Sequence, residues 1–196
     1  MVWTKAKLGA KLMVIKLAQL PRIGYYDLLS NCRILGRPVR GQPVQCVGLG
    51  TIEFKGRVRL GVYPSPFFFN GYCYLDARSK DAKLIFGDGT CINNNFVAIS
   101  EFKSITIGKN VLIGTSVEIY DSNFHGIKPD KRRISIPEDS AEVVIEDNVF
   151  IGSNVKVLKG VTIGRDSVIA NGSLVIKSIP SGVVAGGNPA KVIKYL

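Results

Sequence analysis

The chain has 196 residues, 46% of them hydrophobic, and carries 26 Lys and Arg against 15 Asp and Glu. This length suits one domain with a sizeable core. Eleven of the basic residues lie within the first 60 positions, where they face only two acidic residues. Such a charge could attract an anionic membrane, a phosphorylated or nucleotide-linked substrate, or nucleic acid. Because no nucleic-acid-binding motif accompanies the charge, we expect no nucleic-acid partner.

Residues 3–20 are predicted to form an amphipathic helix, because apolar side chains recur at helical spacing. The apolar stripe comprises Leu8, Leu12 and Ile15, with Gln19 as a further candidate. Lys16 interrupts the apolar run and no small-x-small cleavage site follows, so we do not expect a signal peptide. The run is also too short to span a bilayer. Two roles stay open: packing on the end of the core, or laying residues 1–20 on an anionic membrane surface.

The four cysteines show no CxxC spacing and have no histidine nearby. Free thiols in a cytoplasmic protein are the plain interpretation. Five aromatic residues gather between Phe67 and Tyr74. A cluster of this kind is more often a core plug or a subunit contact than a ligand site.

Ile or Val returns every six residues through the second half of the chain. These residues are Ile107, Ile113, Ile119, Ile145, Ile151, Val157, Ile163, Ile169 and Val175. A period of six with aliphatic residues inside predicts short strands joined by tight turns, three strands to a coil and five to six coils. Corner residues supply the turn conformations; the candidates are Asn110, Asn148, Asn154 and Asn171. The pattern is typical of a parallel β-helix, in which each coil contacts mainly its neighbours.

The repeat stops for about twenty residues after Ile119. The only histidine, His125, stands six residues after Ile119, where the next Ile or Val of the repeat is expected. We expect residues 126–142, which include the basic run 131–133, to form an excursion loop. The predicted organisation is an N-terminal basic segment, a β-helix and a closing segment, with the ranges 1–46, 47–180 and 181–196. Because a narrow prism has little interior, a ligand site is expected between prisms, and so is oligomerisation.

Three segments carry a resemblance to a known family. They are ITIGKNVLIGTSVEIYDSNFHGI, VVIEDNVFIGSNVKVLKGVTIGRDSVIANGSLVIKSIP and VVAGGNPAKVI. In order and spacing they resemble the hexapeptide-repeat acyltransferases, and among these the maltose and galactoside acetyltransferases and the O-acetyltransferases of bacterial surface polysaccharides. The resemblance covers residues 84–196 well and 47–83 loosely. It implies a left-handed β-helix, a homotrimer with active sites between subunits, acetyl-CoA as co-substrate and no required metal.

The resemblance also implies roles for individual residues. His125 matches the general base, and imidazole suits that task because it titrates near neutral pH. The backbone N–H of Ser153 matches an oxyanion donor. The residues expected at the acceptor are Asn94, Asp121 and Phe150, with a one-residue ambiguity for Asn94 within 92–95 and a turn-forming role open for Asp121. The residues expected at coenzyme A are Gly152, Ala170, Asn171, Gly172, Lys177, Lys191 and Lys194, the lysines for its phosphates.

The implied function is O-acetylation of a sugar hydroxyl, in the synthesis of O-antigen, capsule or exopolysaccharide. N-acetylation of an amino sugar or sugar nucleotide, xenobiotic acetylation and a catalytically silent scaffold stay open as alternatives. Zinc carbonic anhydrases of related appearance need three histidine ligands, which this chain lacks. Serine acetyltransferases and lipid A-type acyltransferases carry large helical domains that the sequence does not show. If the acceptor is lipid-linked or nascent glycan, the basic helix could hold the protein at the inner face of a membrane.

Overall fold

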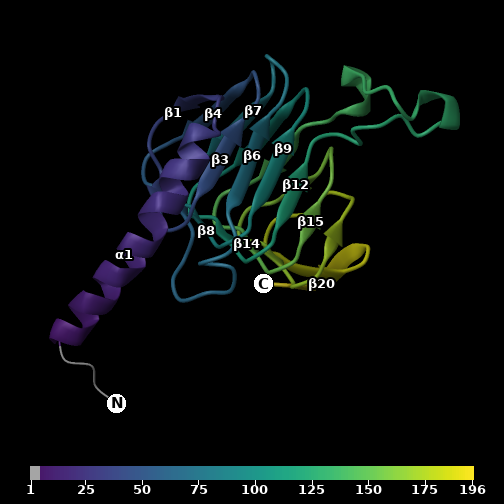
Figure 1. The fold of residues 1–196 in the computed structure, drawn as a ribbon. Helices are drawn as coiled ribbons and strands as arrows, with labels where there is room; N and C mark the ends of the chain where they lie inside the picture. Colours follow the sequence, from purple (N-terminus) through teal and green to yellow (C-terminus); the bar gives the residue numbers. More distant parts are fainter. Residues whose placement is uncertain (1–4) are drawn as a thin grey trace.

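The computed structural model describes residues 5–196, apart from the side chains of Lys5, Ala6 and Leu8. The expected start of the helix at residue 3 therefore lies outside the described residues. Beyond the first helix, the chain winds into a left-handed parallel β-helix, a triangular prism with three sheets as walls (Figure 1). Each coil adds one strand to each of the three sheets, as the period of six predicts, and six coils are stacked, within the expected five to six.

The strands are short and recur in the same order in every coil. Sheet A contains β1 (Arg33–Leu35), β4 (Thr51–Phe54), β7 (Lys83–Phe86), β10 (Ser104–Ile107), β13 (Val143–Ile145) and β16 (Thr162–Ile163). Sheet B contains β2 (Val39–Arg40), β5 (Arg59–Leu60), β8 (Cys91–Ile92), β11 (Leu112–Ile113), β14 (Phe150–Ile151), β17 (Val168–Ile169), β19 (Val183–Gly187) and β20 (Ala190–Tyr195). Sheet C contains β3 (Val44–Val47), β6 (Cys73–Ala77), β9 (Val97–Ser100), β12 (Glu118–Tyr120), β15 (Lys156–Val157) and β18 (Leu174–Val175).

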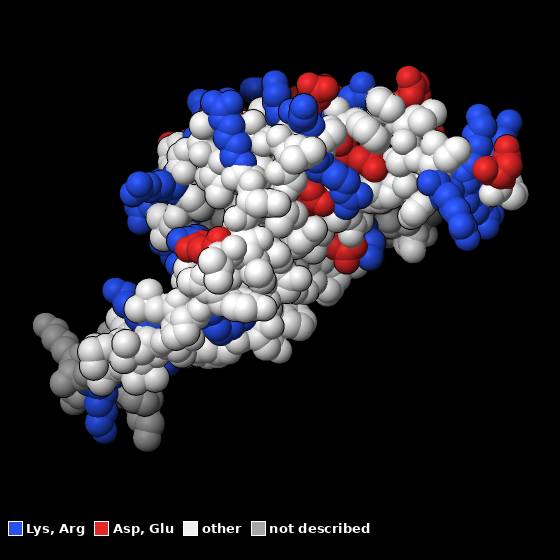
Figure 2. Space-filling view, turned by 45° about the horizontal axis from the view of Figure 1, so that its top comes forward, with Lys and Arg blue, Asp and Glu red and all other residues white. Residues whose placement is uncertain are grey.

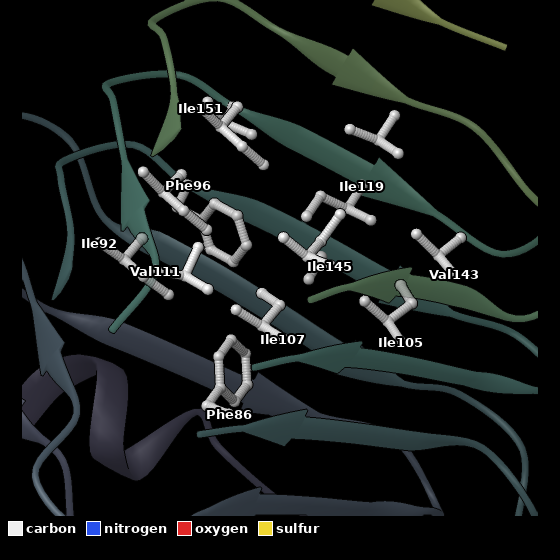
Figure 3. Close-up of a cluster of buried hydrophobic side chains, with 14 of the residues drawn as sticks. Phe86, Ile92, Phe96, Ile105, Ile107, Val111, Ile119, Val143, Ile145 and Ile151 are labelled. Atoms are coloured by element: carbon white, nitrogen blue, oxygen red, sulfur yellow. The ribbon is translucent and has the colours of Figure 1, made fainter. Parts of the chain in front are cut away.

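The nine residues of the six-residue beat form three columns inside the prism. In sheet A, Ile107 pairs with Ile145, which pairs with Ile163. The other two columns are Ile113, Ile151 and Ile169 in sheet B, and Ile119, Val157 and Val175 in sheet C. None of the nine side chains is more than 4% exposed, and Figure 3 shows part of these columns with Phe86 and Phe96. Burial of one aliphatic side chain against the next fixes the register between coils.

Three positions after seven of the nine repeat residues, a residue in the left-handed backbone conformation turns the chain; the exceptions follow Ile119 and Val175. The prediction of this role is confirmed for Asn110, Asn148 and Asn154, whose φ angles are 55°, 59° and 58°. It is wrong for Asn171, because Gly172 takes the left-handed conformation at that corner (φ 70°). Glycine adopts this conformation without a clash of Cβ.

The first coil comes earlier in the chain than the expected start of the β-helix at residue 47. Strands β1, β2 and β3 pair in parallel with β4, β5 and β6. This coil therefore lies almost entirely within the range 1–46. Its outward-facing strands β1 and β2 are exposed throughout, and so the sequence there lacks the alternation that would reveal a strand.

Helix α1 (Lys5–Leu28) continues past the expected end at residue 20 and contains Pro21. Contacts with the loop after β5 hold the turns beyond this proline. Arg22 Nη2 donates to the Gly71 carbonyl at 2.7 Å, and the Tyr26 ring stacks on Tyr72 with centroids 4.5 Å apart. The aromatic segment 67–74 thus docks the helix against the prism.

The two residues Ser30 and Asn31, just past the end of the helix, cover an open sheet edge. Cys46 on β3, the edge strand of sheet C, donates its N–H to Ser30 Oγ at 2.9 Å. The Cys46 carbonyl accepts from Asn31 N at 3.0 Å. These bonds satisfy backbone groups that an uncovered edge would leave unpaired. The first turns of the helix instead project from the prism, as Figure 1 shows.

The chain leaves the prism between β12 and β13, as expected for 126–142. The loop contains two single-turn helices, η1 (Pro129–Lys131) and η2 (Pro137–Asp139), and Figure 1 shows it standing away from the coils. Ala141 N donates to Asp121 O at 2.8 Å at the neck of the loop. Lys and Arg side chains gather over its far end (Figure 2). At the C-terminus, β20 folds back antiparallel on β19 and closes sheet B.

Candidate active site

His125 lies at the neck of the excursion loop, just after β12, and its side chain is exposed. The residue before it, Phe124, has a left-handed backbone with φ 60°. His125 Nδ1 lies 2.8 Å from the Arg132 carbonyl oxygen on the returning part of the loop. A carbonyl can only accept, so Nδ1 carries the proton and Nε2 of the neutral ring is left with a free lone pair. The arrangement suits a general base that uses Nε2.

Ser153 lies on another corner of the prism, between β14 of sheet B and β15 of sheet C. The His125 corner joins sheet C to sheet A, because the excursion separates β12 from β13. The structure therefore does not bring the expected base and the expected oxyanion donor to the same corner of one chain. They can meet only if two chains place these corners side by side.

The other expected residues divide between the same two corners. Lys177 follows β18 and shares the corner type of His125. The residues on sheet B or on its corner with sheet C are Phe150, Gly152, Ser153, Ala170, Asn171, Gly172, Lys191 and Lys194. Phe150 is 47% exposed and stands between Leu112 and Val168 in the register of sheet B. This apolar strip faces outward and is available to a ligand or to another chain.

Asn94 is fully buried, so its side chain is not open to a sugar substrate. Its Oδ1 accepts from Val62 N at 3.0 Å, and its Nδ2 donates to the Val62 and Pro66 carbonyls at 3.0 and 2.8 Å. The expected substrate role of Asn94 is therefore corrected to a structural one. The side chain holds the loop that follows β5, because that loop has no strand partners for these backbone groups.

Asp121 is fully buried as well, and its carboxylate serves the turn between β9 and β10. It accepts from the backbone N–H groups of Glu101 (2.7 Å), Phe102 (3.2 Å) and Lys103 (2.8 Å). Neither orientation of the imidazole nor contact with a sugar is compatible with this position. Of the two roles left open for Asp121, the structure shows the turn-stabilising one.

The backbone N–H of Ser153 already has a partner. It donates to Asn171 Oδ1, one coil further on, at 2.8 Å. Ser153 Oγ in turn accepts from Thr115 N at 3.2 Å. An oxyanion could use the Ser153 N–H only by sharing it with Asn171 or by displacing that side chain.

Backbone N–H groups of the expected coenzyme wall are also engaged. Gly152, Ala170 and Gly172 donate to Ile169, Ala185 and Ser153 carbonyls at 2.8, 2.9 and 2.8 Å. These bonds belong to the ladders between coils, so a pantetheine amide would have to use other groups at this corner. Lys191 and Lys194 are exposed on β20, and Lys191 pairs in register with Gly186 beside Ala170.

Two sets of titratable groups have shifted pKa values: the buried cysteines, and Glu118 with its hydrogen-bond partners. Burial raises the pKa of Cys46 to about 12 and of Cys73 to about 11, so neither thiol forms a nucleophilic thiolate near neutral pH. Partial burial raises the pKa of Glu118, but hydrogen bonds from Lys156 Nζ and the Tyr120 hydroxyl, both 2.7 Å, leave it below its ordinary value. Tyr120 also packs edge-on against Phe124, next to His125.

Two residues at this site were not predicted from the sequence. Arg132 contacts His125 through its backbone carbonyl. Every residue type has this group, so the sequence cannot single it out. Glu101 is buried at the base of the loop, and the only sequence signal is its place where the repeat shifts register near residues 99–104. Within residues 5–196, no group of three or more His, Cys, Asp and Glu side chains is arranged to hold a metal ion. None of the described helices is long and apolar enough to cross a membrane.

Comparison with known proteins identifies the family to which the repeat belongs. Residues 142–177 match the family model "Bacterial transferase hexapeptide (six repeats)". The protein named "Putative lipopolysaccharide biosynthesis O-acetyl transferase WbbJ" of Escherichia coli (strain K12) is 38% identical over 178 residues, 84% of this chain and 79% of that one.

Two solved structures share the fold and at least a quarter of the aligned residues with this chain. The polySia-specific acetyltransferase NeuO has a TM-score of 0.56 and 31% identity, over 81% of this chain and 71% of that one. The hexapeptide-repeat acetyltransferase VCA0836 of Vibrio cholerae, complexed with acetyl coenzyme A, has a TM-score of 0.55 and 25% identity, over 98% and 90%. The repeat, the coil geometry and the similarity to WbbJ over most of both chains lead to one conclusion: this chain belongs to the hexapeptide-repeat acetyltransferase family.

Proposed function

We propose that the protein transfers the acetyl group of acetyl-CoA to a sugar hydroxyl of a bacterial surface polysaccharide, such as O-antigen, capsule or exopolysaccharide. The observation that carries this proposal is the hydrogen bond between His125 Nδ1 and the Arg132 carbonyl. It leaves Nε2 unprotonated on an exposed imidazole, which is what a base for a hydroxyl requires.

In the proposed reaction, His125 Nε2 takes the proton of the acceptor hydroxyl as the oxygen attacks the thioester carbonyl. The tetrahedral intermediate carries an oxyanion, for which the Ser153 N–H is the candidate donor. Collapse breaks the carbon–sulfur bond, and the imidazolium returns its proton to the coenzyme A thiolate. The products are the acetyl ester and coenzyme A, and no metal takes part.

The comparisons support the donor and the acceptor class. VCA0836 binds acetyl coenzyme A, and NeuO is described as specific for polySia. WbbJ is named for lipopolysaccharide biosynthesis. Exposed Lys177, Lys191 and Lys194 are candidates for the phosphates of the coenzyme. A glycan acceptor fits an open, exposed site better than a small enclosed one.

We also propose that the protein is a homotrimer with its active sites between subunits. His125 and Ser153 lie on different corners of one prism, and the apolar strip with Leu112 and Phe150 is exposed. A closed ring of three chains would bring one corner of each type together at every interface. Sedimentation equilibrium at micromolar concentration tests this, and a monomer with full activity would contradict it.

The projecting part of α1 supports a peripheral membrane contact at the cytoplasmic face. Leu12, Met13, Val14 and Leu17 are each more than half exposed, and Figure 2 shows a mostly uncharged surface there with scattered Lys and Arg. Apolar side chains with flanking lysines suit the surface of an anionic bilayer. Vesicles containing phosphatidylserine should retain the protein and release an M13E/L17E variant. Equal partition of both proteins would rule the contact out.

The function is tested by coenzyme A release from acetyl-CoA across a panel of sugars, sugar nucleotides and oligosaccharides. We expect acceptor-dependent release that falls by 10²-fold or more in His125→Ala, the size expected for loss of a general base. Release that survives in this variant would overturn the role of His125. Transfer to amino groups but not to hydroxyls would identify an N-acetyltransferase instead.

A further inference from the structure

A buried acid at the base of the excursion loop has no part in the mechanism above. Glu101 lies in the turn between β9 and β10 and is 6% exposed. A buried carboxylate is costly unless it is paired or hydrogen-bonded. Arg78 Nη1 stands 3.9 Å from Glu101 Oε1 and supplies a partial countercharge.

One oxygen of Glu101 joins the two limbs of the loop. Oε2 accepts from Ser122 Oγ at 2.5 Å, on the limb that leaves the prism. The same oxygen accepts from Ser135 Oγ at 2.8 Å, on the limb that returns. The carboxylate therefore acts as a clamp between segments that the sequence separates.

Both limbs lead directly to the imidazole. Ser122 Oγ also accepts from Phe124 N at 2.9 Å, next to His125, and the Phe124 ring lies under the Arg78 guanidinium at 5.1 Å. On the returning limb, the Ile134 carbonyl accepts from Gly126 N at 2.9 Å. His125 and the Arg132 carbonyl that fixes its tautomer thus sit on opposite limbs, and Glu101 ties the limbs together.

We propose that Glu101 is a positioning residue for His125: through Ser122 and Ser135 it holds the Arg132 carbonyl against Nδ1 and so keeps the proton off Nε2. This inference rests on the proposed function, in which His125 is the base. Small displacements of a catalytic group are enough to slow a reaction substantially. Glu101 itself touches neither substrate nor coenzyme.

The first test uses the imidazole directly and needs no substrate. His125 is the only histidine in the chain, so ¹⁵N-histidine labelling gives one Nδ1 and one Nε2 signal without assignment. The wild type should show a single tautomer protonated at Nδ1. Glu101→Ala, and the double variant Ser122→Ala/Ser135→Ala, should show averaged tautomers.

The second test is kinetic and includes a rescue. We expect Glu101→Ala to lower kcat about tenfold or more, with KM for acetyl-CoA within about twofold, because only the base is misplaced. Glu101→Gln keeps the size and one acceptor oxygen and should fall between Ala and wild type. The matched control is Glu142→Gln, an exposed carboxylate at the end of the loop that accepts from Ser104 Oγ at 3.1 Å. It should stay within about twofold of wild type.

The possible results separate cleanly, provided that circular dichroism shows each variant folded. A changed tautomer with a lower kcat in Glu101→Ala supports the inference. An unchanged tautomer in Glu101→Ala and Glu101→Gln overturns it, whatever happens to kcat. Full activity of His125→Ala would instead overturn the proposed function, and the tautomer experiment would still report whether Glu101 holds the ring.

Discussion

Asn171 Oδ1 occupies the place at the Ser153 N–H, 2.8 Å away, that the oxyanion would need. The same kind of hydrogen bond occurs at other corners, where a side chain of one coil accepts from a backbone N–H of the preceding coil. Asp88 does so for Arg57, and Asp147 for Lys109. Asn171 is thus both a structural cap and a competitor for the proposed oxyanion donor.

Asn171→Ala is expected to remove the cap and free the donor. The midpoint of urea unfolding should fall by an amount equivalent to about 0.5–1.5 kcal/mol, the usual net worth of one hydrogen bond. Because the N–H becomes available, kcat should be at least that of the wild type. A kcat reduced tenfold or more would show that Asn171 itself takes part, and a raised KM for acetyl-CoA would locate it at the coenzyme.

Arg132→Ala should leave the activity nearly unchanged, since His125 uses the backbone carbonyl of this residue and not its side chain. We expect kcat within about threefold of wild type, against a loss of 10²-fold or more for His125→Ala. Steady-state kinetics with one acceptor measures both. A large loss in Arg132→Ala would mean that the guanidinium binds substrate.

Mixed oligomers test whether the site lies between chains. His125→Ala and Ser153→Pro, which lacks the backbone N–H, should each be inactive alone. Because the two residues lie on different corners, mixed trimers contain some interfaces with both groups intact. Random mixing at equal amounts should restore about a quarter of the activity. No recovery in verified mixed oligomers would mean that His125 and Ser153 do not act together at a site between chains.

Ile145→Ala should destabilise the protein strongly. The side chain is 0% exposed and stands between Ile107 and Ile163 in its column, so truncation leaves a cavity that costs about 2–5 kcal/mol. Chemical denaturation gives the value. Ile127→Ala, at a position 78% exposed in the excursion loop, is the control and should change stability by less than about 0.5 kcal/mol.

Glu118→Gln should change how stability depends on pH. The pKa of Glu118 is lowered in the folded chain from 4.5, so its contribution is present above that value and is lost as pH falls through the folded pKa. The thermal midpoints of wild type and variant should therefore differ at pH 7 and converge at acid pH. The side chains of Lys156 and Glu118 are 53% and 27% exposed, so solvent screens the pair and the difference should stay below about 1 kcal/mol. A difference that grows on acidification would contradict the assigned direction.

Much of the fold could be predicted because the repeat is a local property. Ile145 and Ile163 share a column because they are three six-residue steps apart, and this holds without knowing any distant contact. The first coil and the end of α1 could not be predicted. Arg33–Leu35 and Val39–Arg40 are exposed strands with no inward alternation, and the turns after Pro21 depend on Gly71 and Tyr72, far along the chain.

For the site, the break in the repeat singled out His125, because an excursion must leave the prism where the period stops. The sequence by itself thus determined a coiled prism and the corner at which its histidine stands. Only the tertiary structure decided that Asn94 and Asp121 turn inward to hold loops, that Asn171 accepts the Ser153 N–H, and that Glu101 and the Arg132 carbonyl stand behind the imidazole. The reason is physical. The six-residue period indicates which side chains are buried. The hydrogen bonds between separate turns involve backbone groups, which are the same in every residue, so only the folded structure shows which of them meet.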